Sequence, residues 1–418
     1  MSSDVRSDVT SPQVTEVGRS VTLGIVRIAY VAESFRPTVN GVAITAMRIA
    51  EHLAALGHDP LILAPEPEPG QRYPADAGLG YPVVRIPSLA LPLYPGLRVG
   101  LPVPRLRTAI AAHHSEIVHL AGPVILGAGG AAAGRGLGLP MVAVYATDMA
   151  AYARAYHLGR LGESAAWRHL RRLHNSAGRT LAPSTGTAAD LRAKGFARVH
   201  VWGRGVDTTR FSPAKRSASW RASLAPGGEV IVGYVGRLAA EKRLDLLADV
   251  PRLPGVRLVI VGTGPAEAAA RRALPGALFL GQLGGEQLAQ AYASLDVFVH
   301  SGPHDTFGNT LQEAAASGVP VVAPAAGGPL DLVADGLTGF LVTPADAGAL
   351  ARAVARLAAD PVLRVAQGSA GRRAMAGRSW LARCEELVGH YEAVLGRAAA
   401  GDRPAARGHL GVMVGAGA

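Results

Sequence analysis

The chain has 418 residues, which is more than a single hydrophobic core usually organises, so two domains are expected. Its net charge of +11 is carried almost entirely by arginine, since lysine occurs only at positions 194, 215 and 242, and the heavy use of alanine and glycine indicates a GC-rich genome. With 5% aromatic residues and no stacked-aromatic motif, the composition does not favour a nucleic-acid partner. The single cysteine, Cys384, excludes an internal disulfide, and no cysteine or histidine cluster has metal-ligand spacing, so a reducing cytosol is expected.

Both ends of the chain are predicted to lie outside the folded domains. Residues 1–20 are polar and charged, without the basic start and apolar centre of a signal peptide, and predict a disordered arm. Residues 399–418 are rich in glycine, alanine and arginine and predict a disordered tail. The longest mainly apolar run, residues 117–145, is interrupted by charged residues, glycines and prolines, so no membrane span is predicted.

Residues 21–205 alternate strand and helix patterns and are predicted to form the first domain. A nearly continuous apolar run at 23–31 predicts a strand buried on both faces, followed by a polar loop at 33–42 and a helix closed by Gly57. Further strands are predicted at 60–64, 83–86, 116–119, 140–145, 180–182 and 199–202. This alternation is typical of a doubly wound parallel sheet, in which ligands bind at the carboxyl ends of the strands. The residues expected at those ends are Glu33, Asn40, Gly41, His119 and Asp148.

A turn-rich segment at 204–213 predicts a domain boundary, after which the same pattern restarts. Residues 206–378 are predicted to form a second doubly wound domain, with a helix starting at Lys242. Its strands are predicted at 230–235, 257–261, 277–280, 297–300, 320–323 and 340–342. The last helix, within residues 379–398, is expected to return to the first domain. Two such α/β domains would face each other across a cleft.

The stretch from Asp305 to Glu313 is the first candidate for a ligand site. It predicts a helix with Asp305 near the capping position and Glu313 about two turns further in. Amides around Gly308 to Thr310 would then face any phosphate at the positive end of the helix, while Asp305 binds these amides or reaches a ligand hydroxyl. Taken alone, the stretch is better explained as a surface helix with two unrelated acids, and it is the other motifs that favour a ligand site.

A second cluster, residues 236–243, follows a predicted buried strand. Gly236 allows the backbone to approach a ligand, and Arg237 and Lys242 place two cations near a helix start, which favours diphosphate. The alternative is that both are solvated surface residues. For Lys242 this is less favoured, because the chain uses arginine at almost every other basic position. The glycine pair at 327–328 is either a close-approach loop or a helix start, and the Gly262-Thr263-Gly264 segment is predicted to be a plain turn.

Four motifs in this order resemble those of a known enzyme family. They are SFRPTVNGV at residues 34–42, RGVD at 204–207, GRL at 236–238 with Lys242, and DTFGNT at 305–310 with Glu313. From about residue 26 to 396 the chain is similar to retaining GT-B glycosyltransferases of family 4. Tyr145, the Thr147-Asp148 pair and residues 151–156 add a resemblance to actinobacterial GDP-mannose-dependent α-mannosyltransferases that act on lipid acceptors.

The resemblance implies a fold and a mechanism. The fold would be GT-B, with two Rossmann-like doubly wound parallel-sheet domains facing across a cleft. Arg237 and Lys242 would hold the donor diphosphate and stabilise its developing charge, and Gly41 would let a first-domain loop close over it. No metal or other cofactor would be needed, and the sugar would transfer with retention by same-face attack.

The resemblance also implies contacts to the rest of the donor. Glu313 would bind the ribose hydroxyls, and Asp305 a hydroxyl of the transferred sugar. The backbone amides of Phe307, Gly308, Asn309 and Thr310 would bind the sugar and phosphate.

Two positions depart from the family pattern. Asp305 stands where the family has a glutamate, and Ala146 where many members have a histidine that bonds the donor sugar. Three explanations for Ala146 are open: His119 substitutes, Asp148 substitutes, or the contact is dispensable. The hypothesis is that Asp148 contributes on the sugar or acceptor side, whereas a purely structural role is slightly favoured for His119.

The acceptor is indicated only indirectly. Residues 89–103, rich in leucine, proline and tyrosine, contain Arg98 and precede Arg105, and such a patch would suit an anionic membrane surface at the inner face of the plasma membrane. Alternatives to a mannosyltransferase are a UDP-sugar-dependent enzyme of the same fold and a nucleotide-sugar-binding protein without transferase activity. An epimerase would need more acids and histidines in the cleft, and a dehydrogenase would need a complete G-x-G-x-x-G motif.

Overall fold

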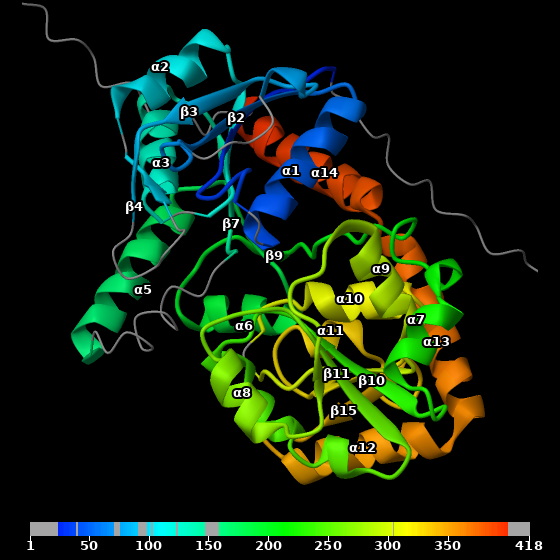
Figure 1. Cartoon of the computed structure of the whole chain (residues 1–418). Coiled ribbons are helices and arrows are strands. Elements are labelled where there is room, and N and C mark those ends of the chain that lie inside the picture. Colours follow the sequence, from blue (N-terminus) through cyan, green and yellow to red (C-terminus); the bar gives the residue numbers. More distant parts are fainter. Residues whose placement is uncertain are drawn as a thin grey trace, which may run out of the picture.

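The protein is described here by a computed structural model, which covers residues 24–38, 41–70, 76–90, 98–101, 103–122, 124–146, 159–303 and 305–399. Two parallel sheets, each covered by helices, form two domains that lie one above the other in Figure 1. Within the described ranges, no helix has the length and apolar character needed to cross a bilayer. The predicted arm, residues 1–20, and nearly all of the predicted tail lie outside the described residues.

The first domain is built on a seven-stranded sheet in which every pairing is parallel. Helices α1 (Gly41–Ala55) and α14 (Trp380–Ala399) cover one face, and α2 (Pro104–Ala112) and α3 (Leu126–Gly136) cover the other. Helices α5 (Gly159–Asn175) and α6 (Thr185–Ala193) follow, and a small antiparallel ribbon pairs β4 (Ser88–Ala90) with β5 (Arg98–Gly100). The strands in sheet order are β3 (Val83–Ile86), β2 (Asp59–Pro65), β1 (Arg27–Val31), β6 (Ile117–Leu120), β7 (Met141–Val144), β8 (Arg179–Ala182) and β9 (Val199–Val201).

The second domain repeats this plan with six parallel strands. Helices α9 (Gly285–Ser294), α10 (Asn309–Ala316) and α13 (Pro361–Met375) pack on one face, and α8 (Glu267–Ala273) and α12 (Ala347–Ala359) on the other. Two short helices, α7 (Ala218–Leu224) and α11 (Pro329–Leu332), complete it. The strands in sheet order are β12 (Leu278–Phe279), β11 (Val256–Val261), β10 (Val230–Val235), β13 (Val297–Val299), β14 (Val321–Pro324) and β15 (Gly339–Val342). The predicted pair of doubly wound parallel sheets is confirmed.

The predicted helix from Lys242 is wrong. The chain instead forms three 3₁₀ turns, at Ala240–Lys242, Leu244–Leu247 and Val250–Arg252. Arg243 has a left-handed backbone (φ 49°, ψ 49°), which interrupts any helix that continues from Lys242. The turns still bury Leu244, Leu247 and Val250 against the sheet, so the apolar pattern is fulfilled without an α-helix.

Both sheets reverse their strand order at one point, between β1 and β6 in the first domain and between β10 and β13 in the second. Strand connections leave in opposite directions there, which opens a crevice at the carboxyl ends of the two strands. The loops after these four strands are therefore the places where a ligand is expected to bind.

The chain passes between the domains twice, and the two crossing segments lie side by side. The Val206 amide donates to the Arg378 carbonyl at 2.9 Å, and Val206 forms a parallel bridge with Ser379. The predicted boundaries after residues 205 and 378 fall at this bridge. A Cβ on Gly205 would lie 2.5 Å from the Trp380 Cα, so only glycine fits where the segments touch.

Helix α14 returns to the first domain and packs beside α1 (Figure 1). It contributes Cys384, Leu387 and Tyr391 to the buried core of that domain. An ion pair also joins α1 to the crossing segment, since the Arg48 Nη2 lies 3.3 Å from the Asp207 Oδ2. The first domain is thus completed by the last helix of the chain.

Candidate active site

The second-domain crevice is bridged by one ion pair. Lys242, in the loop after β10, donates a hydrogen bond from Nζ to the Asp305 carboxylate, in the loop after β13. Each side chain is about one-fifth exposed (22% and 21%), so the pair is accessible from the cleft. The structure therefore places a cation and an acid, predicted as separate contributions, in direct contact.

Asp305 is held by two partners and does not cap a helix, which corrects the sequence prediction. Its second carboxylate oxygen lies 3.0 Å from Nε2 of the buried His300. Burial acts to raise the pKa of Asp305, but His300 and Lys242 outweigh it and hold that pKa well below its usual range. Asp305 is therefore an anion at any physiological pH, able to accept a hydrogen bond from a hydroxyl.

Helix α10 begins after Gly308, which occupies the capping position with a left-handed backbone (φ 106°, ψ 60°) and provides no side-chain cap. The amides of the first turn, from Asn309 onward, thus have no capping side chain. The Phe307 ring is 3% exposed and packs in the second-domain core, so only the backbone of that residue can serve a ligand. The first turn of α10 remains suited to bind an anion.

Glu313 lies about one turn into α10, closer to its start than predicted, because the helix begins at Asn309. Burial raises the pKa of Glu313 to about 7, while Tyr292 and Arg210 oppose this shift. A carboxylate with so little solvation is suited to accept hydrogen bonds from ligand hydroxyls. Neither Tyr292 nor Arg210 was singled out from the sequence.

The loop after β10 packs against the glycine-containing turn at residues 262–264. The Leu238 amide donates to the Thr263 carbonyl at 3.0 Å, and a Cβ on Gly262 would lie 2.0 Å from the Gly236 carbonyl oxygen. The predicted plain turn at 262–264 thus packs against the Arg237 loop. Arg237 is 44% exposed and pairs with Glu241 at 2.8 Å, so its charge lies at the surface of the cleft.

The glycine pair at 327–328 packs against the Asp305 loop. A Cβ on Gly328 would lie 1.8 Å from the Phe307 carbonyl oxygen, and the Gly328 amide donates to the Asp305 carbonyl at 2.9 Å. The pair also starts α11, with Gly328 at the capping position. Both sequence interpretations hold, but the close approach is to the backbone of the protein. From α11, Asp331 accepts a hydrogen bond from the Thr185 amide of the first domain at 2.6 Å.

Two of the first-domain candidates have structural partners. His119 is fully buried, its Nδ1 lies 2.8 Å from the Tyr391 hydroxyl of α14, and its ring stacks on Tyr30. Burial lowers the pKa of His119 to about 3, and these contacts support the structural role for His119, while its role in place of the family histidine at Ala146 stays a prediction. Glu33 accepts hydrogen bonds from four amides at the start of α3, including that of Gly127 at 2.8 Å. It holds α3 in place.

Gly41, at the start of α1, lies opposite the start of α10. A Cβ on Gly41 would be 3.4 Å from Asn309 Nδ2, so the amino ends of one helix from each domain meet across the cleft. Asn40, Asp148 and residues 151–156 lie outside the described residues, so their predicted roles stay predictions. Ala146 is described, and it lines a pocket on the first-domain side.

The predicted lipid-facing patch is only partly described. Leu89 is exposed (62%), as is Arg105. Arg98 instead donates to the Ser88 carbonyl at 2.7 Å and to the Glu66 carbonyl at 3.2 Å, so its charge is engaged by the protein. Within the described ranges, no cluster of histidine, cysteine, aspartate or glutamate has a metal-binding arrangement.

Neither His300 nor the side chain of Arg204 was predicted from the sequence to belong to the site. His300 ends a predicted strand, and the rule that ligand residues follow strand ends would have selected it. Arg204 was included in a quoted motif but was assigned only to a domain boundary.

Two doubly wound parallel-sheet domains are the architecture of the GT-B class of glycosyltransferase. The first-domain residues 39–210 match the family model described as Glycosyltransferase Family 4, and residues 229–360 match the one described as Glycosyl transferases group 1. By this match and the relatives described next, the chain belongs to glycosyltransferase family 4.

Its curated relatives include three named GDP-mannose-dependent alpha-mannosyltransferase. The one from Mycobacterium tuberculosis is 47% identical over 89% of this chain and 98% of its own length. The one from Corynebacterium glutamicum is 42% identical over 88% of this chain and 89% of its own length. Among solved structures, sucrose-phosphate synthase from Thermosynechococcus elongatus has the same fold, with a TM-score of 0.71, 23% identity, and coverage of 89% of this chain and 100% of that one. The protein is therefore a hexosyltransferase of the GT-B fold.

Proposed function

We propose that the protein is a retaining mannosyltransferase that moves mannose from GDP-mannose to a lipid-linked or glycolipid acceptor, without a metal ion. The donor is proposed from the names of the relatives, which are 42% to 48% identical to this chain over most of its length. The observation that carries a transfer role is the contact between Lys242 and Asp305 at the switch point of the second sheet.

The contact places a phosphate-binding cation beside a hydroxyl-binding anion. Lys242 is positioned to neutralise a phosphate, and the anionic Asp305 to accept a hydrogen bond from a sugar hydroxyl, so the bond between sugar and diphosphate would lie between them. Glu313, further along α10, is suited to the ribose hydroxyls. The three side chains of this domain would thus meet the donor in the order sugar, diphosphate and ribose, with Asp305, Lys242 and Glu313 respectively.

The charge of the site suits departure of a diphosphate. As the bond from the anomeric carbon to the phosphate oxygen breaks, negative charge builds on the leaving group, and Lys242, Arg237 and the first-turn amides of α10 stabilise it. The acceptor oxygen forms the new bond to the anomeric carbon on the same face, and its proton passes to the leaving phosphate oxygen. This scheme requires neither a protein nucleophile nor a metal ion.

Calorimetric titration with GDP, UDP and ADP in the presence of a chelator tests the donor. We expect GDP to bind best and Lys242→Ala to weaken it, whereas Lys215→Ala, whose lysine pairs with Glu286 on the surface, leaves it unchanged. A preference for UDP would replace the proposed donor, and the absence of nucleotide binding would contradict the site.

The acceptor is tested separately, by mannose transfer from GDP-mannose into lipid extracts. We propose that the enzyme works at the inner face of the plasma membrane, supported by the exposed Leu89 and Arg105 and by the charge of +11. Co-sedimentation with anionic but not with neutral vesicles is the expected result. Equal binding to both would contradict an electrostatic membrane surface.

A further inference from the structure

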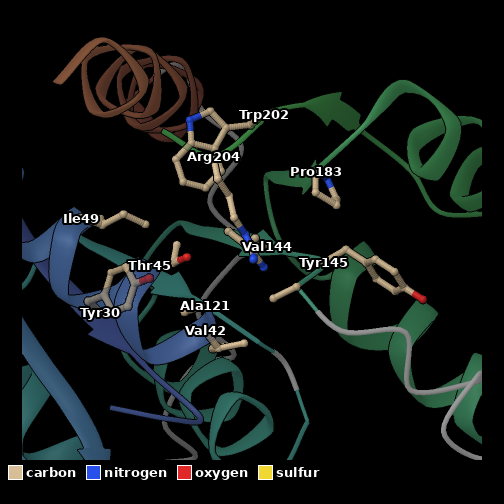
Figure 2. A pocket seen from close by; sticks show the side chains of 11 residues that line it. Tyr30, Val42, Thr45, Ile49, Ala121, Val144, Tyr145, Pro183, Trp202 and Arg204 are labelled. Atoms are coloured by element: carbon tan, nitrogen blue, oxygen red, sulfur yellow. The ribbon is translucent and has the colours of Figure 1, made fainter. Parts of the chain in front are cut away.

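A pocket at the carboxyl edge of the first-domain sheet contains one charged side chain, that of Arg204. This residue follows β9 in the segment that joins the domains, and Figure 2 shows its side chain extending among the residues that line the pocket. The walls are mainly apolar or aromatic, and include Val42, Ile49, Val144 and Trp202. None of the roles assigned above uses Arg204.

Among the described residues, no acidic side chain forms an ion pair with the Arg204 guanidinium, although the Asp305 carboxylate is near enough to act on the pKa of Arg204 and raise it. The guanidinium donates no hydrogen bond to a described residue, and burial lowers the pKa of Arg204 against the opposing effect of Tyr30 and Asp305. Arg372 is a useful contrast, because its guanidinium donates to the carbonyls of Phe211, Ala316 and Thr208. A half-buried cation without such partners is unfavourable, unless a ligand supplies the missing negative charge.

The position of Arg204 indicates where that charge would lie. A Cβ on Gly41 would be 3.7 Å from Arg204 Nη1 and 3.4 Å from Asn309 Nδ2, so the guanidinium is close to the amino ends of both α1 and α10. The Asn309 Oδ1 is also buried without a hydrogen-bond partner in the described part of the chain. Two helix ends and a guanidinium therefore converge on one point of the cleft, where an anion is favoured.

We propose that Arg204 binds the diphosphate of the sugar donor from the first-domain side of the cleft, opposite Lys242. This inference rests on the proposed function, because the donor supplies the diphosphate. It assigns a third cation to the site and makes the segment between the domains part of it. An anion held by Arg204 on one side and by α10 on the other would favour the closed arrangement of the two domains.

The test compares Arg204→Met with Arg204→Lys and with a control, Arg272→Met, whose arginine is exposed on α8. Calorimetry with GDP should show affinity about 10- to 100-fold lower for Arg204→Met, since a charge-assisted hydrogen bond to phosphate is lost. Arg204→Lys should lose less, because it keeps the charge. Guanosine, which has no phosphate, should bind all variants equally.

Thermal unfolding without nucleotide separates binding from folding. Because Arg204 is a half-buried charge that forms no ion pair with a described residue, Arg204→Met should melt no lower than the wild type. Inorganic pyrophosphate should raise the melting midpoint of the wild type and of Arg272→Met, and Arg204→Met should need at least about tenfold more of it. A structural role would instead lower the midpoint of Arg204→Met in the absence of any ligand.

Two failures are distinguishable. If the wild type binds GDP and Arg204→Met binds it equally well, the inference is overturned while the proposed function stands. If the wild type binds no nucleotide, the proposed function fails, and the pyrophosphate melting series still decides whether Arg204 holds a diphosphate. A rise in the Michaelis constant for the acceptor alone would assign Arg204 to an acceptor phosphate and overturn the donor assignment.

Discussion

Lys242 and Asp305 are 63 positions apart in the chain and are joined by a hydrogen bond from the lysine Nζ to the aspartate Oδ1. They meet because β10 and β13, whose loops carry them, are neighbours in the sheet, although β11, α8, β12 and α9 lie between these two strands in sequence. The pair also explains the low pKa of Asp305, together with His300. The contact therefore keeps Asp305 negatively charged beside the positively charged Lys242, where the donor is proposed to bind.

The Lys242–Asp305 contact should contribute measurably to stability. We expect a double-mutant cycle of Lys242→Met and Asp305→Asn to give a coupling of about 1–3 kcal/mol in the free energy of unfolding, because both side chains are largely removed from solvent. Urea unfolding of the wild type, the two single variants and the double variant measures it.

The control cycle uses Arg243 and Asp245, an ion pair that is 41% and 55% exposed. Its coupling should stay below about 1 kcal/mol, as for other exposed pairs. Equal couplings in both cycles would show that the crevice provides no special environment for Lys242 and Asp305.

Glu313 should make stability depend on pH. Its folded-state pKa of about 7 exceeds the ordinary value of 4.5, so between these values the folded state binds more protons than the unfolded state, and stability falls as the pH rises. Relative to Glu313→Gln, the wild type should lose about 3 kcal/mol over this window. Urea unfolding of both proteins at pH 5 and pH 8 measures the difference, and parallel profiles would contradict the shift.

Donor binding should show the opposite trend with pH. The ionised carboxylate of Glu313 accepts hydrogen bonds from hydroxyls better than the neutral acid, so donor affinity in the wild type should rise between pH 6 and pH 8. Glu313→Gln should bind more weakly and with little change over the same range. Calorimetric titration at both values tests this, and an unchanged pH dependence in Glu313→Gln would remove Glu313 from the binding step.

Gly205→Ala should destabilise the junction between the domains. The new methyl group would lie 2.5 Å from the Trp380 Cα, and overpacking of this kind costs about 1–3 kcal/mol. Gly389→Ala is the matched control in α14, because a Cβ there meets nothing within 4 Å, and it should stabilise the helix by about 0.5–1 kcal/mol. Thermal unfolding of both variants measures these changes. An unchanged stability of Gly205→Ala would show that the crossing segments can separate freely.

Gly328→Ala should impair transfer through the Asp305 loop. A Cβ at this position would lie 1.8 Å from the Phe307 carbonyl oxygen, so the loop must move and carry Asp305 away from Lys242. A displacement of about 1 Å can lower a rate about 100-fold. Gly284→Ala, where a Cβ meets no atom within 4 Å, should leave the rate unchanged. Comparable rates in both variants would show that the loop position does not limit transfer.

The amino-acid sequence by itself determined the two doubly wound domains. Buried parallel strands appear in it as continuous apolar runs, and the alternation of these runs with helical patterns can be read directly along the chain. The sequence also placed Lys242, Asp305 and Glu313 near strand ends or on the following helix. It failed at the helix predicted from Lys242, because the left-handed backbone of Arg243 is a property of the folded loop and leaves no mark in the apolar pattern.

Only the tertiary structure decided which of these residues meet. The contact of Asp305 with Lys242, the burial of His119 under Tyr391 of the last helix, and the position of Arg204 between α1 and α10 all join segments that are distant in sequence. Hydrophobic periodicity reports which face of an element is buried, but it carries no information on which element covers that face. In this protein, β10 pairs with β13 and α14 packs on the first domain, and these two tertiary contacts decide which residues come together.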